Sequence, residues 1–306
     1  MGEELRFDGQ VAIITGGGRG MGRTHALSMA RRGARIVVFD RGVDLDGSGS
    51  STQPADDVVA EIEALGSEAV AFHGSVTDEA DAAAAVELAL DSFGRLDILI
   101  NNAGISDPAL FEDQTVQQFR TMLDVQYMGT VLVTKAVWPH LMQHGGRIVN
   151  TCSEGPLGIH EKMTSYGGAK GGVIGFTTTL AAEGPKYAIS VNGFSPRVST
   201  RLSAPEVLAK VYDKPAAAFE KSVARYTTDL ASPACVYLAH DSCALNGVIL
   251  VCGGGEVFRL AYMANDAFHR DALSIEDIAA NVDTIIDMRS AHNVGVGIAG
   301  VADLGR

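Results

Sequence analysis

Tyr166 and Lys170 stand at a spacing that can support proton transfer. Four residues is about one helical turn, so the two side chains share one face of a predicted helix. An ammonium about 4 Å from a phenol, at an effective dielectric of ~20, contributes roughly 4 kcal/mol and lowers the pKa of the phenol toward neutrality. Tyr166 could then exchange a proton with a substrate. The alternative is an ordinary surface Tyr and Lys, because this pair alone is a weak motif.

Ser153 supplies a third polar group upstream of this pair. It follows the apolar run from Gly146 to Thr151, which is typical of a buried strand. Ligands of open α/β sheets bind at the carboxyl ends of the strands. Ser153 is therefore expected to hold a substrate oxygen against Tyr166.

A glycine-rich turn follows the first predicted strand, Val11–Ile14, and precedes a helical pattern. In the turn from Thr15 to Gly22, Gly16 would allow a tight bend and Gly20 would let a pyrophosphate approach backbone N–H groups. Gly22 would let the helix pack closely on the sheet. A glycine-rich loop that binds no nucleotide is the alternative.

Asp40 ends the second predicted strand, about 20 residues beyond the glycine turn, where a carboxylate can bind an adenosine ribose. This position favours NAD, because the 2′-phosphate of NADP would meet a like charge. Arg41 offers that phosphate a counter-ion, and an exposed Asp in a turn is a further alternative. Residues 42–54, rich in Gly, Ser and Asp, are predicted to form a surface excursion near the adenosine end.

Two more predicted strands lead into candidate cofactor contacts. Ser75 and Val76 follow the strand Ala69–His73, where they could touch the adenine edge. Asn101–Gly104 follows the strand Leu96–Ile100, and its small residues permit close approach of a cofactor.

The order and spacing of Thr15–Gly22, Asp40, Asn101–Gly104, Ser153 and Tyr166–Lys170 strongly resemble the short-chain dehydrogenase/reductase family. The resemblance implies Ser153, Tyr166 and Lys170 as the catalytic triad and NAD as the cofactor. The residues that it implies on the cofactor are Gly16, Arg19, Gly20, Met21, Gly22, Asp40, Ser75, Val76, Asn102, Ala103, Gly104, Val125, Tyr166, Lys170, Pro196, Val198 and Thr200.

Roughly the first 255 residues also resemble the dehydrogenase part of multifunctional peroxisomal β-oxidation enzymes and their bacterial relatives. The segments that carry this likeness are Leu5–Gly9, the long insert after Asp40, Ser75–Val76, Pro196–Thr200 and His240–Gly255. It implies a substrate of the (3R)-3-hydroxyacyl-CoA class.

The sequence departs from the family at two positions. Gln126 stands where the family usually has an Asn, so Gln126 is a fourth catalytic candidate whose part in a water-linked proton relay behind Lys170 is left open. Arg197 follows Pro196 where a glycine is usual, so the backbone beside the nicotinamide is expected to differ.

The predicted fold is an α/β, Rossmann-type, doubly wound parallel sheet of seven strands in the order 3-2-1-4-5-6-7, with right-handed crossovers. Residues 1–255 would form one domain with a helical segment at about 202–226, which is a substrate lid or a plain insertion. Residues 256–306 would form a C-terminal extension packed on this domain or on a neighbouring subunit. A near capping box at Ser274 and Asp277 precedes a predicted amphipathic helix there.

Composition narrows the classes of partner. The formal net charge of −13, from 24 Lys+Arg and 37 Asp+Glu, argues against nucleic-acid and anionic-membrane surfaces. No apolar run approaches the ~18 residues of a membrane span, and no signal peptide is expected. The four cysteines lack the spacing of a metal site, so we expect no metal, reduced thiols and a cytoplasmic protein. Glycines follow Tyr166 on a helix that forms a subunit interface in the resembling family, which favours a dimer or tetramer.

The expected reaction is reversible hydride transfer between NAD and a secondary alcohol or ketone. Ser153 would orient the oxygen, Tyr166 would move the proton, and Lys170 would lower the pKa of Tyr166 and hold the nicotinamide ribose. A CoA thioester would need cations near the mouth, and the candidates are Lys162, Arg197, Arg201, Lys210 and Lys214. A free steroid, terpenoid or other cyclic alcohol is the alternative substrate, and a catalytically silent NAD-binding regulatory protein is the alternative of another class.

Overall fold

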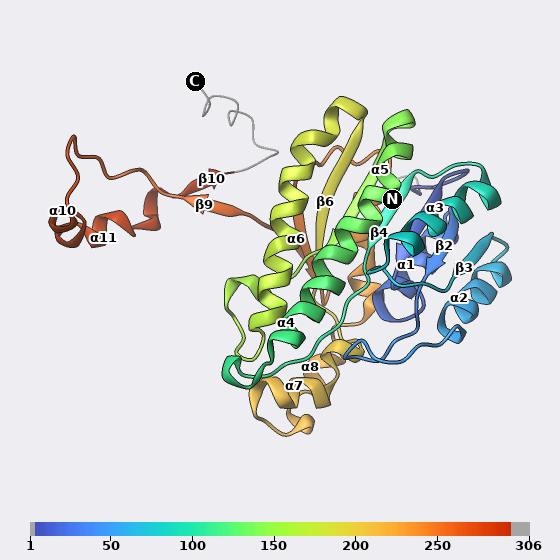
Figure 1. The fold of residues 1–306 in the computed structure, drawn as a ribbon, viewed down its shortest axis with the longest axis horizontal. Coiled ribbons are helices and arrows are strands. Elements are labelled where there is room, and N and C mark those ends of the chain that lie inside the picture. Colours follow the sequence, from blue (N-terminus) through green and yellow to red (C-terminus); the bar gives the residue numbers. More distant parts are fainter. Residues whose placement is uncertain (1–3, 295–306) are drawn as a thin grey trace.

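The computed structural model describes residues 4–294 and is built around one eight-stranded sheet in the order β3-β2-β1-β4-β5-β6-β7-β8 (Figure 1). The strands are β1 (Val11–Thr15), β2 (Arg35–Phe39), β3 (Ala69–Phe72), β4 (Ile98–Asn101), β5 (Gly146–Thr151), β6 (Ile189–Pro196), β7 (Ile249–Gly253) and β8 (Glu256–Leu260). The first seven are parallel, as predicted, and their order confirms the predicted topology.

β8 is an addition that the sequence reading did not foresee. It pairs antiparallel with β7 across the two-residue turn Gly254-Gly255. Both glycines have positive φ, 60° and 84°, which suits the tight turn of a hairpin. The sheet therefore continues into the segment that was expected to lie outside it.

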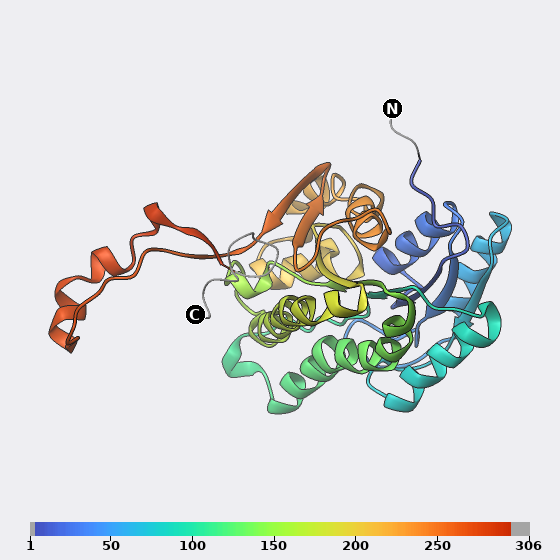
Figure 2. The same ribbon diagram turned by 90° about the horizontal axis from the view of Figure 1, so that it is seen from above.

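Helices cover both faces of the sheet (Figure 2). Alternate strand residues explain the two layers, since Ile14 and Ile100 belong to one core cluster while Ile13 and Leu99 belong to the other. The first core is closed by α1 (Gly20–Ala30), α2 (Gln53–Ala64) and α9 (Ser232–Ala239), and the second by α3 (Glu79–Phe93), α5 (Gly129–His144) and α6 (Thr164–Glu183).

Shorter helices complete the domain near the carboxyl ends of the strands. α4 (Val116–Leu123) runs into α5 through a π-helical turn, η2 (Asp124–Met128). The segment predicted as helical at 202–226 contains α7 (Pro205–Tyr212) and α8 (Glu220–Val223). No helix in residues 4–294 has the length and apolar character to cross a membrane.

The C-terminal segment forms an arm that projects away from the two helical layers (Figures 1 and 2). Its elements are β9 (Tyr262–Ala264), α10 (Ile275–Ala280), α11 (Val282–Ile285) and β10 (His292–Val294), and β9 pairs antiparallel with β10. The capping box of Ser274 and Asp277 is present, but the amphipathic stretch is divided into two short helices. Ile275 is 81% exposed and Ile286 65%, so the apolar face of the arm is not covered by the described part of the chain.

Candidate active site

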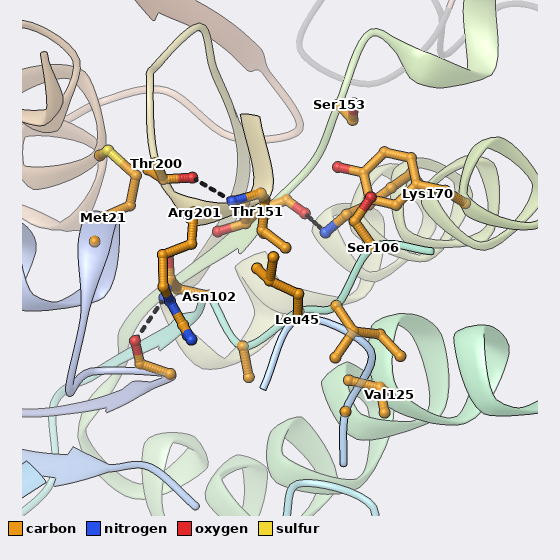
Figure 3. A pocket seen from close by; sticks show the side chains of 18 of the residues that line it. Met21, Leu45, Asn102, Ser106, Val125, Thr151, Ser153, Lys170, Thr200 and Arg201 are labelled. Carbon is orange, nitrogen blue, oxygen red and sulfur yellow. Dashed lines mark hydrogen bonds between the residues drawn. The ribbon is translucent and has the colours of Figure 1, made fainter. Parts of the chain in front are cut away.

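A cavity of about 920 Å³ opens at the carboxyl ends of the parallel strands (Figure 3). It gathers most of the candidate residues from segments far apart in the sequence. The predicted site residues that line it are Gly16, Arg19, Gly20, Met21, Asp40, Ser75, Val76, Asn102, Ala103, Gly104, Val125, Ser153, Tyr166, Lys170, Pro196, Val198 and Thr200. Gly22 and Gln126, which the structure also describes, lie behind its wall.

The glycine turn is fixed to the end of β4 by Asn102. Its Nδ2 donates to the carbonyl oxygens of Thr15 and Gly16, at 3.0 and 3.1 Å, and its backbone N–H donates to Thr15 Oγ1 at 2.9 Å. Gly16 has a φ of 62°, and a Cβ on Gly22 would collide with the Gly16 carbonyl oxygen. The turn thus needs glycine at both positions, and it leaves a compact backbone cradle at the start of α1, where a pyrophosphate fits.

Asp40 is held in place by two backbone donors. Gly18 N–H donates to its Oδ2 and Gly42 N–H to its Oδ1, both at 2.7 Å. These bonds fix the carboxylate at the end of β2 beside the glycine turn. Asp40 lines the cavity, and each of its oxygens can accept a further hydrogen bond, such as one from a ribose hydroxyl.

The loop after Asp40 crosses the cavity. The Val43 carbonyl oxygen accepts hydrogen bonds from Arg19 Nη1 at 3.2 Å and from Arg201 Nη1 at 3.4 Å, and Ser106 N–H donates to the Leu45 carbonyl oxygen at 3.1 Å. Figure 3 places the Leu45 side chain between Arg201 and Val125. Sequence reasoning missed Leu45 as a site residue, and the only signal for it was the unusual length of the loop.

Lys170 and Tyr166 lie on α6 and face the cavity. Lys170 is only 4% exposed, and its Nζ donates to the Thr151 carbonyl oxygen at 2.6 Å (Figure 3). Burial lowers the pKa of Lys170 to about 8. Thr151 Oγ1 is buried and has no hydrogen-bond partner among the described residues.

The pKa of Tyr166 differs from the prediction. Burial raises it above the ordinary value, and a hydrogen bond with Ser153 offsets part of this rise. We expected Lys170 to lower the pKa of Tyr166, and for the chain alone this prediction is wrong. The Lys170 ammonium is directed at Thr151, and the desolvation of the phenol dominates. Tyr166 is therefore protonated at neutral pH.

Comparison with known proteins identifies the family. The model of the short chain dehydrogenase family matches residues 10–206. The chain belongs to this family. The resemblance inferred from the sequence motifs is confirmed.

Three relatives of this short-chain dehydrogenase show the breadth of the family. A short-chain type dehydrogenase/reductase of Mycobacterium tuberculosis is 37% identical over 292 residues, which is 94% of this chain and 97% of that protein. The solved structure of full-length peroxisomal multifunctional enzyme type 2 from Drosophila melanogaster matches with a TM-score of 0.75 at 30% identity, over 95% of this chain and 48% of that one. Carveol dehydrogenase from Mycobacterium avium, solved in complex with NAD, matches with a TM-score of 0.73 at 27% identity, over 81% and 97%.

Gln126, the fourth catalytic candidate, lies in the π-helical turn. Gln126 is buried, and its Nε2 donates to the Ile105 carbonyl oxygen at 2.7 Å. Gly104 separates it from the cavity, since a Cβ there would lie 2.9 Å from Gln126 Oε1. This Oε1 has no donor among the described residues. The Gln126 side chain therefore does not contact the cavity directly, because the backbone of Gly104 lies between them.

Arg197, which follows Pro196 at the end of β6, lines the cavity together with Glu154. The two side chains form a bidentate ion pair. Arg197 Nε donates to Glu154 Oε2 at 2.7 Å, and Arg197 Nη2 donates to Glu154 Oε1 at 2.8 Å. Sequence reasoning missed Glu154, whose position next to Ser153 was the available signal.

The far end of the cavity is apolar and is partly built by α7. Five apolar residues line it: Ile159, Met163, Val207, Leu208 and Val211. Tyr212 adds a hydroxyl that shares a 2.8 Å hydrogen bond with His160 Nδ1. No group of three or more metal-ligating side chains occurs within residues 4–294.

Proposed function

We propose that this short-chain dehydrogenase is an NAD-dependent oxidoreductase that interconverts a secondary alcohol and a ketone. The observation that carries the proposal is the meeting of Ser153, Tyr166 and Lys170 in one cavity with the glycine turn and Asp40. A relative of the same fold, carveol dehydrogenase, was solved with NAD, which supports this choice of cofactor. When bound, NAD supplies the hydride acceptor and a cationic ring.

The residues of the chain position the alcohol and move its proton. Ser153 orients the carbinol oxygen toward Tyr166, and the protonated Tyr166 can donate to a ketone oxygen in the reductive direction. Oxidation requires the phenolate, which nearby positive charge favours. Lys170 is charged below its pKa of about 8, but in the chain alone this charge does not offset the desolvation of the phenol.

We infer that the substrate is a neutral secondary alcohol of the steroid, terpenoid or other cyclic kind, with a (3R)-3-hydroxyacyl-CoA as the second candidate. Most cations that a CoA would need already have partners. Lys162 pairs with Asp213, Arg197 pairs with Glu154, and Arg201 binds the Val43 carbonyl oxygen at the cofactor end. The apolar far wall suits a hydrocarbon skeleton. The multifunctional relatives favour the thioester, and this chain spans only part of their length.

NADH formation with a panel of cyclic secondary alcohols and 3-hydroxyacyl-CoA esters tests this function. A neutral alcohol should be oxidised with a KM that responds little to salt. If only the 3-hydroxyacyl-CoA ester is oxidised, with a KM that rises steeply with salt, the substrate is the CoA thioester and not a neutral alcohol. NAD binding without turnover of any panel member would favour a regulatory protein.

We also propose a cytoplasmic homo-oligomer, a dimer or a tetramer. A Cβ on Gly168 or Gly175 of α6 would meet no atom of the described chain within 4 Å, so a second copy can approach this helix closely. The exposed apolar residues of the arm favour a second contact of this kind. All four cysteines are free and buried, which is consistent with a reducing compartment. Light scattering of the wild type and of Gly175→Leu tests this, and a monomeric wild type would refute it.

A further inference from the structure

Glu154 and Arg197 form an ion pair in the wall of the cavity. The two residues are separated by 43 positions in the chain, yet both line the cavity and meet in a two-bond fork. The Glu154 side chain is 15% exposed and that of Arg197 is 40% exposed. Because each charge has the other as its partner, the pair presents no free charge to a substrate.

Arg197 is anchored to the strand framework. Its backbone N–H donates to the Cys252 carbonyl oxygen on β7 at 2.8 Å, and its guanidinium lies 4.8 Å from the ring centroid of Phe258 on β8. The preceding residue, Pro196, ends β6. The backbone of Arg197 is therefore tied to β6 and β7, and its guanidinium lies over a ring of the added strand β8.

Glu154 lies in the turn that carries Ser153. Gly155 N–H donates to Ser153 Oγ at 3.0 Å, and a Cβ on Gly155 would lie 3.3 Å from the Tyr166 ring. The turn thus packs directly on Tyr166. Glu154 therefore lies between two residues of this turn, Ser153 and Gly155, that are bonded to each other beside the phenol.

We propose that the Glu154–Arg197 pair is a positioning clamp that ties the Ser153 turn to the ends of β6, β7 and β8 and so holds the Ser153 hydroxyl in register with Tyr166. This inference rests on the proposed function and deepens it, since neither residue of the clamp transfers a proton. A misplacement of about 1 Å in a catalytic group costs on the order of a hundredfold in rate.

A double-mutant cycle tests the clamp. Glu154→Gln keeps the shape of the side chain and removes its charge, and Arg197→Met keeps the length and removes the guanidinium. Each variant should lose about 10- to 100-fold in kcat with an unchanged Kd for NADH, and the double variant should lose no more than either one. Arg197→Lys, which cannot form the fork, should recover part of the loss.

The matched control is the pair Arg225–Glu256, which joins at 2.9 Å with both side chains more than half exposed. Arg225→Met should change kcat by less than about twofold. Circular dichroism and Tm show whether each variant is folded. An unchanged kcat in both single variants, additive losses in the double variant, or an equal loss in the control would overturn the clamp.

The titration of Tyr166 gives a readout that does not need turnover. Because the hydrogen bond with Ser153 lowers the pKa of Tyr166, loss of the clamp should raise that pKa further. Ultraviolet difference titration or isotope-labelled tyrosine NMR, with Tyr166→Phe as reference, measures it. If the wild type oxidises no alcohol, the proposed function fails, and this titration alone decides on the clamp: an unchanged pKa in Glu154→Gln and Arg197→Met refutes it.

Discussion

Lys170 Nζ lies 5.9 Å from the centroid of the Tyr166 ring, above its face, and donates its 2.6 Å hydrogen bond to the carbonyl oxygen of Thr151. The two catalytic candidates therefore interact through space in a buried site. Burial acts on them in opposite directions, raising the pKa of Tyr166 and lowering that of Lys170. Near neutral pH the phenol of Tyr166 is therefore neutral, while Lys170, with a pKa of about 8, still carries most of its positive charge.

Tyr166→Phe should retain NADH binding and lose at least about a hundredfold in kcat, which is the low end for removal of a general acid or base. Fluorescence titration measures binding, and NADH absorbance measures turnover on any active alcohol. Tyr187→Phe is the control, because Tyr187 packs on Trp138 in the second core cluster. Full turnover by Tyr166→Phe would assign proton transfer to another residue.

Lys170 should make the stability of the chain depend on alkaline pH. Its pKa is about 8 in the fold against 10.5 in the unfolded chain, so the unfolded state binds more protons between these values. Wild-type stability should thus rise with pH between them, by at most about 3 kcal/mol, relative to Lys170→Met. Urea unfolding of both proteins across this range measures the difference. If the free energy of unfolding of the wild type, relative to Lys170→Met, stayed constant or fell with pH, burial would not lower the pKa of Lys170.

The order of elements could be predicted because it depends on local signals. Apolar runs of strand length, the glycine turn and the alternation of strands and helices each constrain the chain within a short window. The same holds for Tyr166 and Lys170, which one helical turn brings together. Their positions in the cavity follow from the topology of the sheet.

The features that were missed depend on contacts between distant segments. Leu45 reaches the cavity only because the loop is bonded to Arg19, Ser106 and Arg201. The pairing of Glu154 with Arg197 requires β5 and β6 to be neighbours, which is a tertiary fact. The pKa of Tyr166 depends on desolvation, which no spacing in a sequence reveals.

His25 should make the chain sensitive to acid. It is fully buried between α1 and α9, its Nδ1 shares a 2.8 Å hydrogen bond with Ser232, and burial lowers its pKa from 6.5 to about 3. Between pH 6.5 and 3 the His25 side chain is protonated in the unfolded chain but not in the folded one. The free energy of unfolding should therefore decrease as pH falls through this range, by about 1.4 kcal/mol per pH unit. His25→Gln should remove this slope, and His269→Gln, which changes an exposed histidine, should keep it. An equal slope in all three proteins, measured by urea unfolding, would show that His25 titrates normally.

Asp40 should set the preference for NAD over NADP. Its carboxylate is fixed by Gly18 and Gly42, so it cannot turn away from a 2′-phosphate. Arg201 stands close enough to Asp40 and to Arg19 for their charges to act on its pKa. Removing the carboxylate should leave a net positive environment at the ribose, and the NADP to NAD ratio of kcat/KM should rise at least about tenfold in Asp40→Ala, which corresponds to about 1.4 kcal/mol.

Two further variants separate this effect from damage to the turn. Asp40→Asn keeps one oxygen acceptor for the backbone donors and should also gain with NADP, since it too lacks the charge. Asp44→Ala removes another carboxylate that lines the cavity and acts on Arg201, so it should shift the ratio less. Initial rates with both cofactors on one alcohol give all four ratios. Equal use of both cofactors by the wild type, or a larger shift in Asp44→Ala than in Asp40→Ala, would remove Asp40 from the ribose site.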